Sequence, residues 1–191
     1  MTWLIVLLAV VVALVGAALA VDRMRSASLK QRFGPEYDHA VEQKGDRRNA
    51  EAALRDRVKQ RDGLDISELT PEARTRYVEQ WFAVQARFVD DPRHTVAEAA
   101  ELVTRVMNER GYPADDSDDH SNYVSVDHPD LAAGYRMAQA VRMGDETATI
   151  DDQRQAIQNF RSLFDELLNS RADSADEAAA PGAERAEHDV S

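Results

Sequence analysis

The sequence predicts a mainly α-helical protein with an N-terminal transmembrane helix, a charged helical stalk, a small bundle of about four helices and a disordered acidic tail. Three observations predict this order. The chain starts with an uncharged apolar run, its middle part has bulky apolar residues at helical spacing, and its end is dominated by Ala, Asp, Glu and Ser. The predicted boundaries are 1–21 for the anchor, 22–65 for the stalk, 66–169 for the bundle and 170–191 for the tail.

The run from Trp3 to Val21 contains no charged residue and predicts the transmembrane helix. A helix over this run would be roughly 28 Å long, at about 1.5 Å per residue, which matches a bilayer hydrocarbon core of about 30 Å. No Lys or Arg precedes the run, whereas Arg23, Arg25, Lys30 and Arg32 follow it closely. The positive-inside rule therefore predicts a plasma (inner) membrane protein with the N-terminus outside and the C-terminal domain in the cytoplasm.

The same run allows two other interpretations. Ala18-Leu19-Ala20 is a small-x-small site, so the run could be a signal peptide whose cleavage releases a secreted, periplasmic or cell-envelope protein. Met1-Thr2 carries no basic residue, and the run exceeds the usual apolar length of about 7 to 15 residues, which favours the uncleaved anchor. Ala9, Ala13 and Ala17 recur every four residues, which allows a homodimer through this helix, although such spacing also arises by chance in an Ala-rich helix.

Residues 22–65 are predicted to be a charged helical stalk that acts as a spacer. Basic and acidic residues are interleaved there and bulky apolar residues are few. The first helix is expected to end at about Phe33, because Gly34-Pro35 disfavours its continuation. Two further helices are expected over residues 36–43 and 46–60, the second supported by opposite charges four residues apart.

Residues 66–169 are predicted to fold into a compact bundle of four amphipathic helices. Start signals for these helices occur at Thr70-Pro71, at Asp91-Pro92, at Asp127 to Pro129, and at Thr149. Glycines end the second and third helices, and residues 112–126 are expected to be the one long connection.

The apolar side chains of the first bundle helix recur at spacings of three and four, as on one face of a helix. They are Ala73, Tyr77, Trp81, Val84 and Phe88. If Tyr77, Trp81 and Phe88 were exposed, they would be the natural anchors for a protein partner, because buried aromatic anchors dominate binding energy at interfaces.

The densest cluster of possible metal ligands lies in the predicted long connection: Asp115, Asp116, Asp118, Asp119 and His120. A calcium loop counted from Asp116 lacks both the required glycine and the bidentate glutamate. Solvation of a surface loop explains the same residues. A metal-assisted hydrolase that uses Asp116, Asp118 and His120 is therefore only a minor alternative.

No other pattern indicates catalysis or a cofactor. The sequence has no cysteine, which excludes disulfides and thiolate chemistry, and it has no HExxH, GxSxG, Walker A or GxGxxG pattern. Asp127 is expected to cap the following helix rather than to orient the imidazole of His128. The sequence thus predicts no catalytic, cofactor-binding or metal site. With 35 acidic against 23 basic residues, nucleic acid is not an expected partner.

Several short phrases resemble a group of small membrane-anchored or secreted proteins of high-GC bacteria, chiefly actinobacteria. The phrases are Arg32-Phe33-Gly34-Pro35-Glu36-Tyr37, Val89-Asp90-Asp91-Pro92, Glu109-Arg110-Gly111-Tyr112-Pro113, Val126-Asp127-His128-Pro129 and Phe160-Arg161-Ser162-Leu163-Phe164. The resemblance covers about Lys30 to Leu168. It implies no activity, ligand or catalytic residue.

Together these observations predict a non-catalytic, single-pass membrane protein that presents an acidic helical docking or scaffold module to the cytoplasm. Its expected partners are the membrane, through Trp3 to Val21, and a protein that the sequence does not identify. The alternative is an extracytoplasmic or secreted protein released by signal-peptide cleavage.

Overall fold

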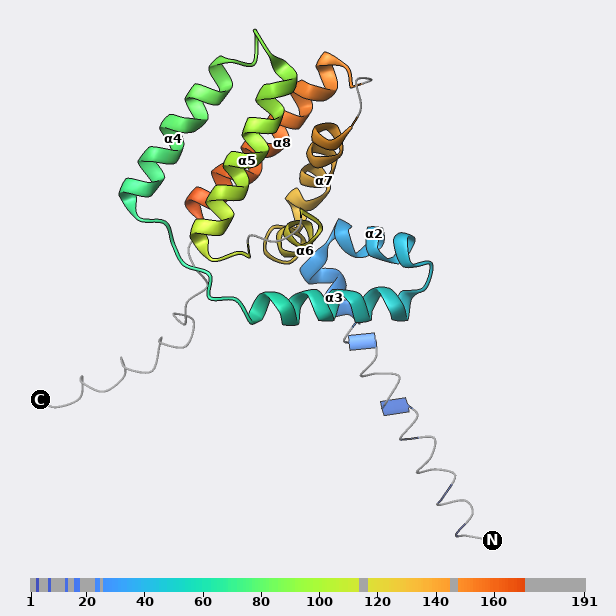
Figure 1. The fold of residues 1–191 in the computed structure, drawn as a ribbon. Coiled ribbons are helices and arrows are strands. Elements are labelled where there is room, and N and C mark those ends of the chain that lie inside the picture. The colour runs from blue at the N-terminus through green and yellow to red at the C-terminus, as the bar shows by residue number, and fades with distance from the viewer. Residues whose placement is uncertain are drawn as a thin grey trace, which may run out of the picture.

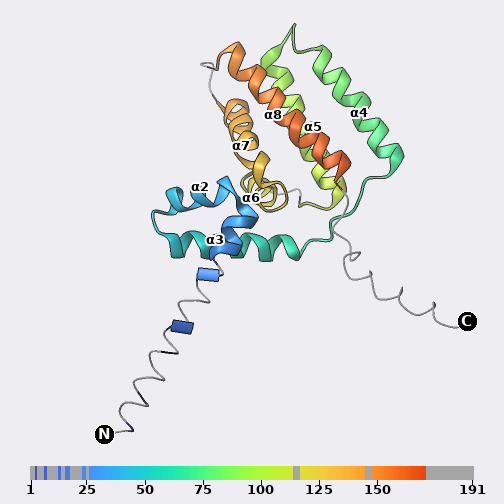
Figure 2. The same cartoon turned by 180° about the vertical axis from the view of Figure 1, so that it is seen from behind.

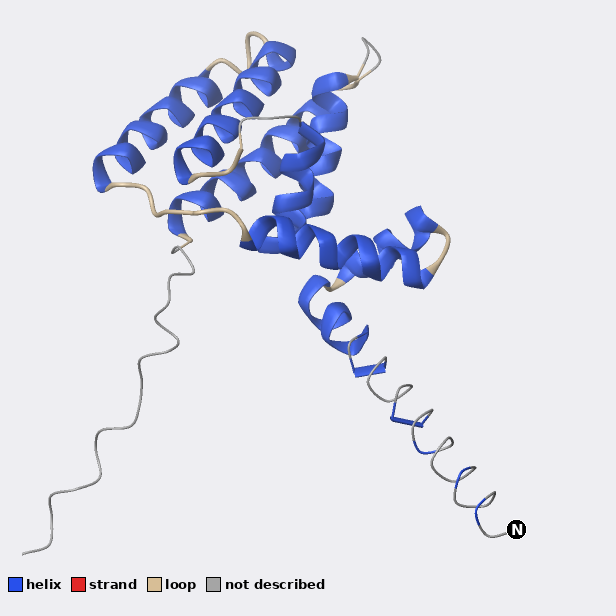
Figure 3. Cartoon of the chain, turned by 60° about the horizontal axis from the view of Figure 1, so that its bottom comes forward, coloured by secondary structure: helices blue, strands red, loops and turns tan. Residues whose placement is uncertain are grey.

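The computed structural model describes residues 26–113, 117–144 and 148–170, together with isolated positions before residue 26; for residues 117–119 it describes the backbone alone. The regular structure in these ranges is helical throughout, which confirms the predicted mainly α-helical class (Figure 3). The helices are α2 (Pro35–Lys44), α3 (Arg47–Asp62), α4 (Pro71–Ala86), α5 (Pro92–Arg110), α6 (Ser117–Asp127), α7 (Pro129–Met143) and α8 (Ile150–Asn169).

The N-terminal helices end and begin where glycine and proline predict. Residues 26–33 are helical, and Gly34 stops this helix with a φ of 49°, in the left-handed region. Pro35 occupies the first turn of α2, and Asp46 caps α3 by accepting a hydrogen bond of 3.1 Å from the backbone N–H of Asn49. The predicted helices over residues 36–43 and 46–60 are therefore confirmed as α2 and α3.

The four predicted bundle helices correspond to α4, α5, α7 and α8. Each begins beside a predicted start signal, and the Thr70, Asp91 and Thr149 side chains accept capping hydrogen bonds. Helix α8 packs against both α5 and α7, and α4 packs on α5 at the edge of the bundle (Figure 1). In the core, the ring of Trp81 stacks on that of Phe164 with centroids 4.8 Å apart. Helices α4, α5, α7 and α8 thus enclose one apolar core, which includes 25 buried residues.

Helix α6 is a fifth element of this domain, and the prediction of a long connection over residues 112–126 is wrong in that part. It packs against α7 on one side and α3 on the other. Tyr123 and Val124 join the bundle core, whereas Val126 joins a second apolar cluster. Because α6 is buried on two sides, its apolar residues do not form the single stripe that identifies a helix from sequence.

The structure also differs from the interpretation of residues 22–65 as a spacer. Helices α2 and α3 form a hairpin that lies across one end of the bundle, against α6 and α7 (Figures 1 and 2). A second core holds them there, with Phe33 and Leu54 both fully buried. Its members are Phe33, Tyr37, Ala40, Ala50, Leu54 and Val126. The charges that indicate a solvated stalk are in part internal, since Glu36 is 2% and Glu51 3% exposed.

The segment between α3 and α4 is fixed by the end of α5. The buried Arg110 donates from Nε to the carbonyl oxygen of Ser67 at 3.2 Å and from Nη1 to that of Leu167 at 2.8 Å. Gly111 has a φ of 109°, and a Cβ at this position would lie 2.3 Å from the carbonyl oxygen of Asp65. Only glycine allows this close approach. The end of α5 therefore contacts both the segment that precedes α4 and, through Arg110, the last turn of α8.

The predicted membrane anchor (1–21) and the predicted tail (170–191) lie largely outside the described residues. Ala9 of the small-residue stripe also lies outside them, whereas Ala13 and Ala17 are described and both are exposed. Among the helices that the structure describes, none has the length and apolar character needed to cross a membrane.

Candidate functional site

A polar cleft of about 630 Å³ lies between the α2–α3 hairpin and helices α6 and α7. Its lining residues are Glu36, His39, Gln43, Lys44, Ala53, Asp56, Arg57, Gln60, Ser121, Asn122, Arg136, Gln139, Ala140 and Met143. The volume falls in the usual range for small-molecule sites, about 300 to 1,000 Å³. Since the hairpin forms one wall, the cleft exists only because residues 35–62 fold back onto the bundle.

A single buried carboxylate binds two arginines in the cleft. Arg136 of α7 donates to both oxygens of Glu36, from Nη1 at 3.0 Å and from Nη2 at 2.8 Å. Arg57 of α3 donates from Nη1 to Glu36 Oε1 at 3.2 Å and to Ser125 Oγ of α6 at 3.3 Å. Glu36 therefore joins α2, α3 and α7, and two guanidinium groups share one negative charge.

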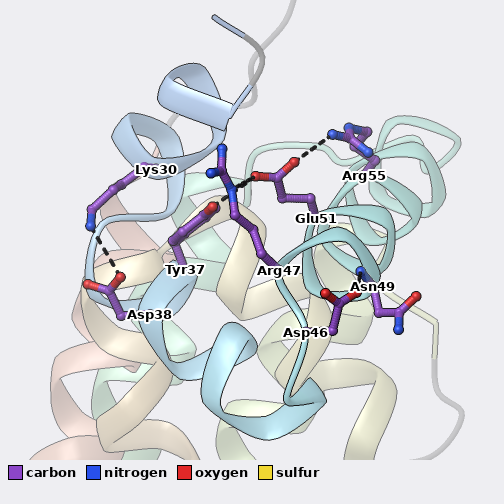
Figure 4. A network of polar contacts seen from close by, with 8 residues as sticks. All are labelled: Lys30, Tyr37, Asp38, Asp46, Arg47, Asn49, Glu51 and Arg55. Carbon is purple, nitrogen blue, oxygen red and sulfur yellow. Dashed lines mark hydrogen bonds and ion pairs between the residues drawn. The ribbon is translucent and has the colours of Figure 1, made fainter. Parts of the chain in front are cut away.

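A second buried carboxylate lies at the other face of the hairpin (Figure 4). Glu51 accepts hydrogen bonds from Tyr37 Oη at 2.8 Å and Arg47 Nε at 2.9 Å on Oε1, and from Arg55 Nη2 at 3.0 Å on Oε2. Burial acts to raise the pKa of Glu51, but its hydrogen bonds and the charge of Arg47 outweigh burial and lower the pKa to about 2. The ionised form of Glu51 thus stabilises the hairpin.

This lowered pKa predicts a specific loss of stability in acid. Because the pKa of Glu51 is about 2 in the folded chain and 4.5 for the free group, its contribution is present above pH 4.5 and is lost as the pH falls toward 2. We expect Glu51→Gln to lower the free energy of unfolding by about 2 to 3 kcal/mol at pH 7. Chemical denaturation at a series of pH values should show this difference from the wild type shrinking between pH 5 and pH 2.

Tyr37→Phe provides the matched comparison, because it keeps the buried ring and removes one hydrogen bond to Glu51. It should lose only part of the acid-sensitive stability. If the difference between Glu51→Gln and the wild type is independent of pH, the hydrogen-bonded carboxylate does not have the role assigned to it.

Asp127 has a different role from the predicted one. Its carboxylate accepts hydrogen bonds from Arg61 Nε and Tyr112 Oη, both at 2.6 Å, and the N-cap of α7 is His128, which makes no side-chain capping bond. The prediction that Asp127 caps this helix is therefore wrong, because Arg61 and the buried Tyr112 take its oxygens. Burial raises the pKa of Tyr112, and the charge of Asp127 raises it further. Burial lowers the pKa of the neighbouring His128. The bond from Arg61 to Asp127 holds α3 to α6.

The predicted cluster of metal ligands is only partly within the described residues. Asp115 and Asp116 lie outside them, as do the side chains of Asp118 and Asp119. His120 is buried, and its Nε2 lies 2.6 Å from the carbonyl oxygen of Pro113, with which it shares a hydrogen bond. No group of three acidic, His or Cys side chains in the described ranges could hold a metal ion. This arrangement therefore provides no support for the hydrolase alternative.

The aromatic residues predicted as possible binding anchors belong to the core instead. Tyr77 and Trp81 are 5% and 1% exposed, and Phe88 is partly buried against the same core. The neighbouring Phe82 is 61% exposed, and Val89 in the turn after α4 is 87% exposed. The sequence does not reveal this surface, because Phe82 lies outside the stripe of spacing three and four that identifies the buried face.

Comparison with known proteins finds no relative of this chain. No family model matches the chain, and neither a curated protein nor a solved structure shows significant similarity to it.

Proposed function

We propose that this chain is a non-catalytic, single-pass membrane protein that docks a protein partner on the outer face of α4. The uncharged run from Trp3 to Val21 supports the anchor, and the basic residues after it support a cytoplasmic domain. The helix over residues 26–33 leads directly to Phe33 in the second core. Such a connection would hold the domain close to the membrane rather than on a long spacer.

The observation that carries the docking role is an apolar stripe along α4 and the turn after it. Val78, Phe82 and Ala86 on α4 and Val89 in the turn are all exposed, at spacings of four, four and three. This is the pattern that an amphipathic partner helix contacts. Exposed apolar side chains at consecutive positions of one helix face are also what a binding surface requires.

Charge indicates the chemistry of the partner. Around the stripe, Arg76 pairs with Glu109 and Arg87 pairs with Glu98. Glu79, beside Val78, is exposed and has no ion pair within the described part of the chain. With a net charge of −12, two copies of this chain repel each other. We therefore propose an amphipathic helix with basic residues beside its apolar face, contributed by a different protein.

Photo-crosslinking tests the docking surface in native membranes. A photo-reactive amino acid at position 82 should give one adduct with a second protein, and Val78→Asp should abolish it. The same amino acid at position 158, which is exposed on α8, is the control and should give no adduct. An adduct of two copies of this chain, or no adduct at position 82, would contradict the proposal.

The partner segment identified in this way can then be tested as a synthetic peptide. It should bind the full-length chain in lipid nanodiscs and become helical on binding. Phe82→Ala should weaken its affinity by about tenfold or more, because exposed aromatic residues at the centre of an interface contribute most of the energy. Thr75→Ala, on the same helix but outside the stripe, should change the affinity by less than about twofold. Equal effects of the two substitutions would contradict docking on the stripe.

Membrane topology is tested separately. A reporter that is active only outside the membrane, fused to the C-terminus, should remain inactive, and N-terminal sequencing should find residues 1–21 retained. Reporter activity with cleavage after Ala20 would instead support the secreted or cell-envelope alternative, for which the Ala18-Leu19-Ala20 site provides the motivation.

A further inference from the structure

The cleft between the hairpin and α6–α7 contains a buried polar group without a partner. Gln139 is 5% exposed, and its Nε2 donates to Tyr135 Oη at 2.7 Å, while its Oε1 has no hydrogen-bond partner in the described part of the chain. Turning the amide by 180° exchanges the two atoms and leaves Nε2 unpaired instead. In either orientation one polar atom of Gln139, a residue that lines the cleft, lacks a partner. A buried group of this kind normally binds water or a ligand.

The arginines of the cleft also have unused donors. Arg136 directs both Nη atoms to Glu36, and Arg57 uses Nη1 alone for its contacts with Glu36 and Ser125. Nη2 and Nε of Arg57 therefore remain available to a bound molecule, since no interaction within the described chain uses them. A guanidinium group with two free donors is suited to a carboxylate or phosphate group.

The charge of the lining favours an anion. Lys44, Arg57 and Arg136 oppose only Glu36 and Asp56, so the cleft is positive by one charge in a chain whose net charge is −12. Lys44 at the end of α2 is exposed and has no ion pair within the described ranges. A positive cleft in an acidic protein attracts small anions while the surrounding surface repels large polyanions.

We infer that this cleft binds a small organic anion. A carboxylate or phosphate group would lie against Arg57 and Lys44. A hydroxyl or amino group of the same molecule would pair with Gln139 once its amide turns toward the cleft, because the unpaired atom is shielded from solvent in the free chain. The volume of about 630 Å³ is sufficient for a molecule of metabolite size. Arg136 and Glu36 form a rigid base to the site, because both Nη atoms of Arg136 bind the Glu36 carboxylate.

Isothermal titration calorimetry on the full-length chain in lipid nanodiscs tests this inference. The probes are succinate and inorganic phosphate, with glycerol as a neutral polar control, all at constant ionic strength. We expect saturable binding of one or both anions and none of glycerol. Preference for succinate or for phosphate identifies which anionic group the cleft accepts.

Two charge reversals provide a matched pair of variants. Lys44→Glu should weaken anion binding about fivefold or more, whereas Lys59→Glu, the same change on α3 at an exposed position outside the lining, should change it by less than about twofold. Gln139→Glu keeps the size of the side chain and an acceptor for Tyr135, and it should weaken binding about tenfold or more by repulsion.

Thermal unfolding of each variant without ligand checks that the fold is retained. If Gln139→Glu does not fold, the comparison of Lys44→Glu with Lys59→Glu decides the result, because both positions are exposed. Absence of saturable binding by the wild-type chain, or equal weakening by the two lysine substitutions, would overturn the inference.

Discussion

Phe33→Ala is expected to lower the free energy of unfolding of the whole domain by about 3 to 5 kcal/mol, as for other fully buried phenylalanines. Phe33 is 0% exposed and belongs to the second core, together with Leu54 of α3 and Val126 of α6. Its removal would leave a cavity at the point where three helical segments meet. Denaturant unfolding can be monitored by the fluorescence of Trp81, which is buried in the other core. It therefore measures the loss of stability at a site distant from the substitution.

Phe82→Ala is the matched control, because it makes the same substitution at a side chain that is 61% exposed. It should change the stability by less than about 0.5 kcal/mol. If Phe33→Ala has an effect as small as this, the hairpin does not contribute to the stability of the bundle and residues 22–65 are a spacer after all.

Glu36→Gln is expected to destabilise the domain by about 2 to 3 kcal/mol, since it removes the carboxylate that two arginines share. Glu36 is 2% exposed, whereas the side chains of Arg57 and Arg136 are 18% and 29% exposed. The two guanidinium groups would repel each other without the intervening charge, but they are partly hydrated, which keeps the effect below that of Phe33→Ala. Urea denaturation at pH 7 measures it.

Glu42→Gln is the control for this substitution, because it removes the same charge from an exposed position of the same helix. If Glu36→Gln lowers the free energy of unfolding no more than Glu42→Gln does, the ion pairs of Glu36 make no net contribution to stability. Arg136→Ala in the Glu36→Gln background should add less destabilisation than it does alone, because the two residues act through one interaction.

Local signals predicted most of the helices. Proline at the first turn, capping by Thr70, Asp91 and Thr149, and glycine after α5 and α7 depend only on neighbouring residues, and the structure has these elements at those places. The stripe of Tyr77 and Trp81 was likewise predicted as one face of a helix, and both side chains are buried. These features require no knowledge of what each helix packs against.

The features that the sequence did not predict depend on contacts between distant residues. Glu36 and Arg136 are 100 positions apart, and no local pattern shows that a charged residue of α2 lies on an arginine of α7. Residues of α6 are buried on two sides, which removes the periodicity that identifies an amphipathic helix. The hairpin resembled a solvated stalk because its buried charges have the same residue types as exposed ones, although Glu36 binds Arg136 of the bundle and Arg61 binds Asp127 of α6.

The candidate cleft was missed for the same reason. Its lining comes from four helices, two in the segment predicted as a spacer and one, α6, in the predicted connection. Gln139 in isolation is an ordinary polar residue in an amphipathic helix. Its amide is buried with an unpaired atom only in the folded domain, where it bonds to Tyr135 of the bundle core and lines the cleft beside the hairpin.

The packing of the hairpin predicts that α2 and α3 unfold together with the bundle. Native-state hydrogen exchange on the full-length chain can compare amides near Leu54 in α3 with amides near Val103 in α5. Both groups should exchange with the same free energy of opening, to within about 1 kcal/mol. Exchange of the α3 amides at several kcal/mol lower free energy, while the α5 amides stay protected, would contradict this prediction.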